Sequence, residues 1–300
     1  MKHKGETTRV LKRFDPWRSS LCTCPLKYTL HPYTGCSHYC LYCYASSYIG
    51  RKMSTPKRDF INHLIKDLSK IEPKHIIELS TSSDPYPPIE EWIQLTRKTL
   101  EILSQREFKI LITTKSTLVT RDIDLLIKSR IAVLITITTL ENTLSKKLEP
   151  GAPSPSERLK AVRILSENEI PVGVRIDPII PGINEDPFYI KELVDAVVDA
   201  GAIHIVTSTF KARMDSLKRL TEVFGDNHLV ELYKSRGEWI HGSLYLPVEE
   251  RKRLLKPVVE RAKNHGVSVA TCREGLGKEF FRAKSCDGSH MIGLKPRVRK

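Results

Sequence analysis

Short apolar runs rich in Ile, Val and Thr alternate along the chain with amphipathic stretches of helical period. Six such runs are typical of buried strands, and five amphipathic stretches between them are typical of helices. The predicted strands are Tyr28–Tyr33, His75–Ser80, Phe108–Thr113, Ile131–Thr138, Val172–Pro178 and Ile203–Thr207. The predicted helices are Arg58–Ser69, Glu90–Ser104, Arg121–Lys128, Pro155–Asn168 and Asp186–Asp199. Strand–helix repeats predict a parallel sheet with right-handed crossovers and both faces covered. The pattern therefore predicts an α/β fold, an open (β/α)6 partial TIM barrel.

Segments with other patterns flank this barrel. We expect residues 1–27 to form an N-terminal arm, residues 28–225 the barrel, and residues 226–300 a C-terminal extension or lid. The residue pattern of the extension predicts helices at Asn227–Ser235 and Val248–Asn264, a short strand at Val267–Ala270, and then a glycine-rich tail.

Three of the seven cysteines crowd into the polar loop that follows the first predicted strand. Cys36, Cys40 and Cys43 are spaced so that three thiolates can bind one face of a [4Fe–4S] cluster, which leaves the fourth iron open to an outside ligand. An open coordination position on iron is typical of a cluster that catalyses a reaction rather than one that only transfers electrons. Two other interpretations stay open at this point. A zinc site usually closes all four positions with paired Cys-x-x-Cys turns, and free structural cysteines usually scatter through apolar segments.

Composition adds a large basic excess. The 300 residues, 40% of them hydrophobic, suffice for one large core, and the net charge is +14 with an isoelectric point near 9.4. This charge predicts a nucleic-acid partner, with a thermophile-like composition spread over solvated helices as the alternative. The basic residues at the two ends are Lys2, Lys4, Arg9, Lys12, Arg13, Lys295, Arg297, Arg299 and Lys300.

The location of the protein is predicted from two further features. No apolar run approaches the roughly 18 residues that span a bilayer, and no apolar segment follows the basic start. An odd number of cysteines argues against a disulfide framework. We therefore expect a cytoplasmic protein whose cysteines bind metal.

Polar residues follow several predicted strands, where a parallel barrel carries its chemistry. Ser83 lies in the proline-stiffened loop after the second strand, Lys115 follows the third, and Thr136 and Thr138 end the fourth. We expect them to contact a ligand. Turn formation and a solvated lysine are the structural alternatives.

Two charged pairs stand close in the sequence. Arg175 and Asp177 share one face of an otherwise apolar strand, so we expect both to face the barrel interior and bind a ligand, with a structural ion pair as the alternative. Glu149 and Arg158 flank a proline-rich turn, as a site pair or as a cap and a surface charge. We count Arg158 and Arg175 among the predicted cofactor contacts.

Four motifs occur in order over roughly residues 28–210. They are Pro32–Ala45 with the three cysteines, Ser83–Glu90, Leu148–Leu159 and Val174–Asn184. Together they resemble the spore photoproduct lyase-like group of radical S-adenosylmethionine (SAM) enzymes, also described as DNA-repair-photolyase-like. This resemblance independently implies the partial barrel.

The resemblance also implies a cofactor set and residue roles. Cys36, Cys40 and Cys43 are implied as ligands of a [4Fe–4S] cluster whose open iron binds SAM. Ser83, Lys115 and a hydroxyl of the fourth strand, Thr136 or Thr138, are suggested as SAM contacts. A reductant such as ferredoxin or flavodoxin is the expected partner.

Two tyrosines beside the last cysteine match a known relay. Tyr42 and Tyr44 correspond to the tyrosine pair that relays hydrogen in true spore photoproduct lyases, and we assign them as catalytic, with packing over the cluster as the alternative for Tyr42. The donor cysteine of those enzymes has no counterpart, because the chain has Thr81-Ser-Ser-Asp84 there. The resemblance therefore extends poorly to cleavage of thymine dimers.

The remaining cysteines are Cys22, Cys24, Cys272 and Cys286. Cys286-Asp-Gly-Ser-His290 is similar to the closing half of CDGSH iron–sulfur sites. Because the termini of a barrel can meet, we interpret these four thiols as a candidate second site for zinc or an auxiliary cluster, with unliganded thiols as the alternative.

The sequence thus predicts a radical SAM enzyme that cleaves SAM reductively to a 5′-deoxyadenosyl radical and abstracts hydrogen from a substrate, with a nucleic acid favoured. Two alternatives remain: the same chemistry on a peptide or small metabolite, and a nonenzymatic zinc or cluster protein that binds nucleic acid.

Overall fold

The computed structural model describes residues 8–14, 19–79 and 81–294. Several predicted features lie outside these ranges. They are the strand end at Ser80 and the basic residues Lys2, Lys4, Lys295, Arg297, Arg299 and Lys300.

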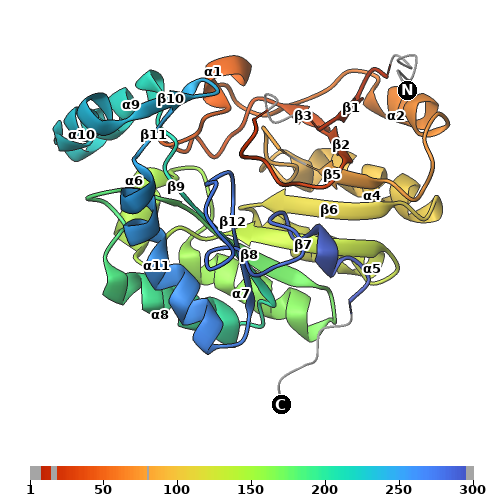
Figure 1. Cartoon of the computed structure of the whole chain (residues 1–300). Helices are drawn as coiled ribbons and strands as arrows, with labels where there is room; N and C mark the ends of the chain where they lie inside the picture. The colour runs from red at the N-terminus through yellow and green to blue at the C-terminus, as the bar shows by residue number, and fades with distance from the viewer. Residues whose placement is uncertain (1–7, 15–18, 80, 295–300) are drawn as a thin grey trace.

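An eight-stranded sheet in the order β1-β2-β5-β6-β7-β8-β9-β12 forms the centre of the molecule (Figure 1). Its strands are β1 (Leu11–Arg13), β2 (Lys27–Leu30), β5 (Ile76–Leu79), β6 (Lys109–Thr114), β7 (Arg130–Thr136), β8 (Val172–Ile179), β9 (His204–Thr209) and β12 (Ser268–Thr271). All neighbours pair in parallel except β1, which is antiparallel to β2. The sheet does not close on itself, so the predicted open α/β partial barrel is confirmed.

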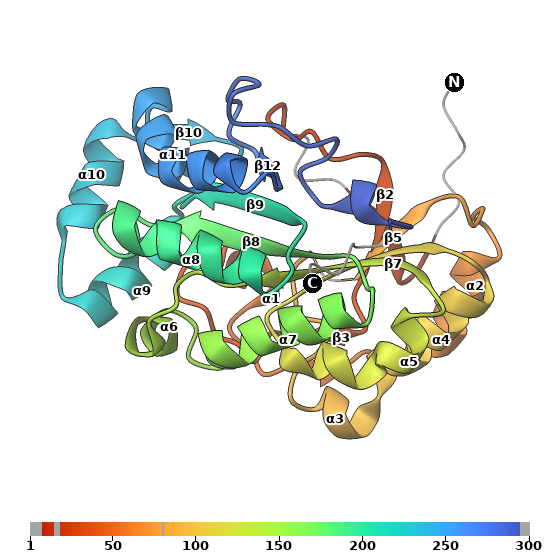
Figure 2. The same cartoon turned by 90° about the horizontal axis from the view of Figure 1, so that it is seen from below.

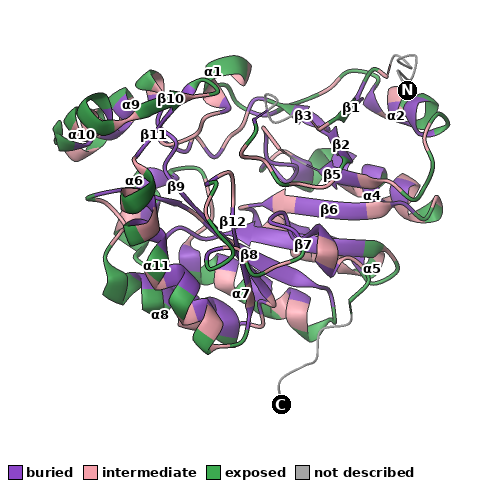
Figure 3. Cartoon of the chain, viewed as in Figure 1, coloured by how far each residue is buried: buried purple, intermediate pink, exposed green. Residues whose placement is uncertain are grey.

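Apolar side chains in register join the strands. Ile110 of β6 lies opposite Ile131 of β7, and Ile112 opposite Val133, and all four are fully buried or nearly so. β-branched residues pack well on such a pleated surface, which explains why these runs form strands. Figure 3 shows the central strands buried and the outward helix faces exposed.

Helices cover the outer face of the sheet, as Figure 2 shows from below. They are α2 (Phe60–Leu68), α4 (Leu95–Gln105), α5 (Ile123–Leu126), α7 (Pro155–Glu167), α8 (Pro187–Asp199) and α11 (Val248–Asn264). Local chemistry sets their starts: Ser154 caps α7 and forms a capping box with Glu157, and Asp186 caps α8. Apart from the helix predicted over Glu90–Ser104, the predicted helices at these positions are confirmed to within a few residues.

The remaining elements are not part of the central sheet. They are β3 (Tyr33–Thr34), β4 (Thr55–Pro56), β10 (Glu238–Ile240), β11 (Ser243–Tyr245), α1 (Ser46–Ile49), α3 (Glu90–Ile93), α6 (Asn142–Leu148), α9 (Met214–Phe224), α10 (His228–Arg236), η1 (Thr117–Asp122) and η2 (Ser289–Met291).

The single helix predicted over Glu90–Ser104 is wrong, because the chain breaks at Gln94. Gln94 adopts a left-handed backbone with φ of 54°, which separates α3 from α4. The buried carboxylate of Glu90 then accepts hydrogen bonds from the amides of Thr96 and Arg97, at 2.9 and 3.1 Å. The chain therefore forms two helices here, and the buried carboxylate of Glu90, in α3, accepts hydrogen bonds from the first turn of α4.

The segment after β12 covers part of the inner face of the sheet. Met291 is buried against Leu134 and Val206 in a small apolar cluster. Gly173 leaves room for it, since a Cβ there would lie 3.1 Å from the terminal methyl of Met291. This segment therefore packs against β7 and β9 on the inner side of the sheet, and its Cys286 and Asp287 line the cavity described below.

Both flanking segments add strands to the sheet, β1 from the predicted arm and β12 from the predicted extension. The domain boundaries themselves stay a prediction. Among the described residues, no helix is long and apolar enough to cross a membrane.

Candidate functional site

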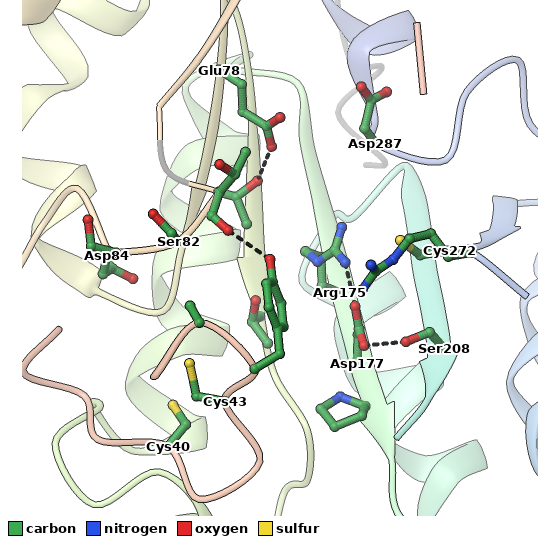
Figure 4. A pocket seen from close by; sticks show the side chains of 18 of the residues that line it. Cys40, Cys43, Glu78, Ser82, Asp84, Arg175, Asp177, Ser208, Cys272 and Asp287 are labelled. Atoms are coloured by element: carbon green, nitrogen blue, oxygen red, sulfur yellow. Dashed lines mark hydrogen bonds and ion pairs between the residues drawn. The ribbon is translucent and has the colours of Figure 1, made fainter. Parts of the chain in front are cut away.

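A cavity of about 470 Å³ opens at the carboxyl ends of the parallel strands. Strand ends and the loops after them supply its walls, as expected for a parallel barrel. Figure 4 shows Cys40 and Cys43 on one side and Arg175, Asp177, Ser208 and Cys272 across from them. All three cysteines of the motif, Cys36 included, line this cavity.

The cysteine loop begins where its backbone packs closely against the backbone of residues 52–56. The short strands β3 and β4 pair antiparallel, and the amide of Cys36 donates to the carbonyl of Lys52 at 2.9 Å. Gly35, with φ of 74°, makes this possible, because a Cβ there would lie 2.3 Å from the carbonyl oxygen of Met53. The glycine before Cys36 is therefore required by geometry.

Two arginines hold the carbonyls of this loop. Arg51 donates to the carbonyls of Tyr39 and Cys40, at 3.0 and 3.2 Å. Arg219 of α9 donates to the carbonyls of Leu41 and Cys43, at 2.9 and 3.1 Å. Sequence reasoning missed Arg219, because it lies 176 residues from Cys43 and no local pattern links them.

A buried His–Asp pair connects the loop to the second and third strand ends. The ring of His38 lies 3.0 Å from the carboxylate of Asp84, which also accepts from the Thr114 hydroxyl at 2.7 Å and the Lys115 amide at 2.8 Å. Burial alone would raise the pKa of Asp84, but His38 and these hydrogen bonds outweigh it and lower the pKa to about 2. Asp84 is thus an anion that fixes the strand-end loop.

Glu149 and Arg158 form a fully buried ion pair, 2.6 Å between Arg158 Nη1 and Glu149 Oε2. Arg158 also donates to the carbonyl of Thr136 at 2.9 Å. The phenol of Tyr42 donates to Glu149. Glu149 and Arg158 thus form a buried ion pair, neither a cap nor a surface charge, and Tyr42 is hydrogen-bonded to it. Neither residue lines the cavity, so a role for the pair in the site stays a prediction.

Lys115 lies half-buried at the cavity wall, with its Nζ 5.6 Å from the centre of the Tyr42 ring. Burial opposes its positive charge, but Cys40 and Glu149 more than offset this and raise the pKa of Lys115. A cation therefore stands beside the thiols, where it can meet a carboxylate.

Arg175 and Asp177 both face the cavity, as predicted, and they pair with each other. The hydroxyl of Ser208 donates to Asp177 at 2.5 Å. Burial opposes ionisation of Asp177, while Arg175 and Lys211 lower its pKa. The pair is an ionised, polar patch of the wall.

The other predicted contacts fall into two groups. Ser83, Thr136 and Tyr44 line the cavity, and the Tyr44 phenol donates to the carbonyl of Thr81 at 2.7 Å. Thr138 and Arg158 are buried and are not among the lining residues. The assignment of these side chains to SAM binding or to hydrogen relay stays a prediction.

The three thiols can serve an iron–sulfur cluster although they do not converge. Within the described ranges, no three His, Cys, Asp or Glu side chains surround one point. Cluster ligands need no such convergence, because each thiolate binds a different iron. Burial raises the pKa of the Cys36 and Cys40 thiols and so opposes free thiolates, whose negative charge a bound metal would offset.

Comparison with known proteins decides the family. The family model described as the radical SAM superfamily matches residues 30–194, more than half of the chain. The chain belongs to the radical SAM superfamily. Membership makes the protein an enzyme of the radical SAM class, which sets aside the nonenzymatic alternative. It also implies a [4Fe–4S] cluster and SAM, in agreement with the donor set of the loop.

Two relatives share substantial sequence. An uncharacterized protein of Methanocaldococcus jannaschii is 38% identical over 182 residues, which are 55% of this chain and 65% of that protein. An uncharacterized protein of Acidianus two-tailed virus is 30% identical over 241 residues, 68% of this chain and 79% of that protein. The chain therefore spans slightly less than two thirds of the Methanocaldococcus protein.

The fold is similar to that of spore photoproduct lyase. A variant of that enzyme with bound AdoMet and dinucleoside spore photoproduct superposes with a TM-score of 0.66 and 17% sequence identity, over 89% of this chain and 80% of the lyase chain. The resemblance expected from the four motifs is confirmed in the fold.

Proposed function

We propose that this radical SAM enzyme acts on a nucleic acid or nucleotide bound over the cavity of the cysteine loop. The observation that carries the proposal is one shared wall: Cys36, Cys40 and Cys43 line the cavity together with Ser83 and Lys115 at the strand ends. With SAM at its open iron, a [4Fe–4S] cluster supplies one-electron cleavage of SAM to a 5′-deoxyadenosyl radical, which abstracts a hydrogen atom.

The residues of the chain hold and orient the reactants. We assign Cys36, Cys40 and Cys43 to the cluster, and the cation of Lys115 to the carboxylate of SAM. Buried hydroxyls such as Ser83 and Thr136 supply further hydrogen bonds. Arg51 and Arg219 satisfy the carbonyls of the loop, so that its thiols keep their positions when the substrate binds.

Basic and aromatic side chains at the cavity support a nucleic-acid substrate. Arg13 and Tyr48 are exposed, Phe14 and Arg273 are half-buried, and all four line the cavity. Cations bind phosphates and aromatic rings stack on bases, which fits the net charge of +14. A further support is that a spore photoproduct lyase of similar fold holds a dinucleoside in its solved structure.

A strained backbone marks the same wall. Arg273 adopts φ of 53°, a conformation that side chains other than glycine rarely adopt. Strain of this kind collects at functional sites. We therefore include Arg273 among the substrate contacts.

The proposal does not extend to the lyase reaction on thymine dimers. Thr81 and Ser82 occupy the loop where the lyases carry a donor cysteine, and an O–H bond is too strong to give hydrogen readily to a carbon radical. We further propose a reducing compartment as the place of action, because thiolate-bound clusters are sensitive to oxygen, and ferredoxin or flavodoxin as the electron donor.

The test is release of 5′-deoxyadenosine by the anaerobically reconstituted protein with SAM and dithionite. We expect release in the wild type, and we expect DNA or RNA oligonucleotides to increase it while a peptide mixture does not. Stimulation by peptides or small metabolites alone would contradict the nucleic-acid substrate, and absence of release would contradict the enzyme activity.

A salt titration tests the phosphate contact separately. Binding of an oligonucleotide should weaken with salt, and Arg13→Gln should reduce the slope of log K against log salt by about 0.7–0.9, the loss of one phosphate contact. Arg163→Gln, on the exposed face of α7, is the matched control and should leave the slope unchanged. Equal slopes for the wild type and Arg13→Gln would remove Arg13 from the interface.

A further inference from the structure

Four thiols outside the cysteine loop meet at another part of the cavity wall. The sulfurs of Cys24 and Cys286 lie 3.5 Å apart. Cys22 lies near enough to Cys24, and Cys272 to Cys286, for each pair to interact electrostatically, and all four line the cavity. The four side chains form one group, although 262 residues separate Cys24 from Cys286 in the chain.

The fold brings these thiols together across the opening of the barrel. Cys22 and Cys24 precede β2, near one edge of the sheet, and Cys272 directly follows β12 at the other edge. Cys286 lies in the segment that crosses the inner face. The cysteine group therefore joins the two sides of a sheet that does not close by hydrogen bonds.

A buried ion network holds the segment that carries Cys286. The Nζ of Lys27 lies 2.6 Å from Asp287 and 2.6 Å from Glu78, and all three side chains are almost fully buried. Burying three charges is costly unless they pair in good geometry. The network fixes Asp287, and with it Cys286, against the start of β2.

The donor set and its spacing suit one tetrahedral metal ion. Zinc sites of four thiolates have Zn–S bonds near 2.3 Å, so neighbouring sulfurs are separated by roughly 3.8 Å. The separation of 3.5 Å between Cys24 and Cys286 is close to that edge, and shorter than expected for thiolates on different irons of a cubane. Four thiolates also close every position, which is typical of a structural site.

We propose that Cys22, Cys24, Cys272 and Cys286 bind one zinc-type divalent ion that joins the two edges of the open barrel. The described thiols do not yet surround one point, so binding requires the outer two, Cys22 and Cys272, to turn towards the central pair. Neighbouring cations offset the negative charge of such a thiolate site. Lys27 lies near Cys24, and Arg175 and Arg273 lie near Cys272.

Such an ion would fix a wall that contacts the substrate. Cys272 lies beside Arg175, to which it is hydrogen-bonded, and immediately before Arg273. Binding at Cys272 would therefore hold both arginines in position at the cavity. This role is distinct from that of the cysteine loop, which leaves one iron open.

Metal analysis of anaerobically purified protein tests the proposal. We expect about one zinc per chain in the wild type in addition to about four irons. Cys24→Ser and Cys286→Ser should each lower zinc at least fivefold and leave iron unchanged. Thr23→Ser is the matched control, since it lies between two of the ligands and keeps its hydroxyl; it should retain zinc.

Two further measurements keep the result interpretable. Cobalt(II) added to metal-free wild-type protein should give the intense visible bands of tetrahedral thiolate coordination, and this readout needs no variant to fold. Cys36→Ala should lose iron and keep zinc, so that failure of the cluster and failure of the second site are distinguished.

Three outcomes would overturn the proposal. The first is wild-type protein with no zinc and no cobalt bands. The second is about eight irons with matching sulfide, which would indicate an auxiliary cluster. The third is a mass deficit of two hydrogens in protein kept free of oxygen, which would indicate a disulfide between Cys24 and Cys286.

Discussion

Two sets of cysteines border one cavity, and they are assembled in different ways. Cys36, Cys40 and Cys43 come from one loop, whose carbonyls are held by arginines and whose start is fixed by a glycine. The second set comes from both ends of the described chain and is held by a buried ion network. In our proposals, three thiols leave one iron open for chemistry, whereas four thiols close a structural metal site.

The largest effect should follow from breaking the first set. Cys43→Ala leaves two ligands for the cluster, so iron should fall from about four per chain to near zero and 5′-deoxyadenosine release to background. Cys286→Ser, which alters only the second set, should keep its iron. Iron content and nucleoside release, measured side by side, check the difference. Full iron in Cys43→Ala would show that the two sets are misassigned.

The ion network of the second set should matter for stability. Lys27→Met leaves the carboxylates of Glu78 and Asp287 buried without a cation, so the free energy of unfolding should fall by about 3–5 kcal/mol. Lys74→Met is the matched control, because Lys74 forms an exposed pair with Glu72 at 2.6 Å and its loss should leave the free energy of unfolding nearly unchanged. Urea denaturation measures both. Equal losses would mean that the network does not hold the segment.

Stability near the first set should depend on pH. Burial, with Lys57 nearby, lowers the pKa of His31 to about 4, below its ordinary value of 6.5. The unfolded chain therefore gains a proton before the folded one, and stability present above pH 6.5 is lost as the pH falls towards 4. The loss from His31 should be roughly 2 kcal/mol after allowance for partial exposure.

His31→Asn should remove this part of the pH dependence, and His228→Asn, on the exposed start of α10, should leave it unchanged. Unfolding free energies at several pH values between 4 and 7 measure the slope. The same slope in the wild type and His31→Asn would exclude His31 as its source.

The smallest effect should follow from loosening the loop without touching a thiol. Arg219→Met removes donors to the carbonyls of Leu41 and Cys43, which costs about 1–2 kcal/mol of local stability. We expect up to roughly tenfold slower nucleoside release with the cluster still present, because about 1.4 kcal/mol added to the activation free energy lowers a rate tenfold. Arg163→Met is the control for loss of charge. An unchanged rate would show that the hydrogen bonds from Arg219 are not needed to position the thiols.

The same contrast explains what the sequence could predict. The strands, the helices α7, α8 and α11, and the cysteine loop follow from local patterns, because period, caps and spacing are short-range signals. The break at Gln94 was missed, since it depends on a carboxylate of Glu90 that is buried only in the fold. Arg219 and the Lys27 network were missed as well, because they join segments far apart in the chain.

Electron paramagnetic resonance of the anaerobically reduced protein, with and without SAM, tests the central claim most directly. If three thiols leave one iron open, the reduced wild type should show the signal of a [4Fe–4S] cluster, and that signal should change when SAM is added. A cluster signal that SAM leaves unaltered, or protein that contains zinc and no iron at Cys36, Cys40 and Cys43, would contradict the account.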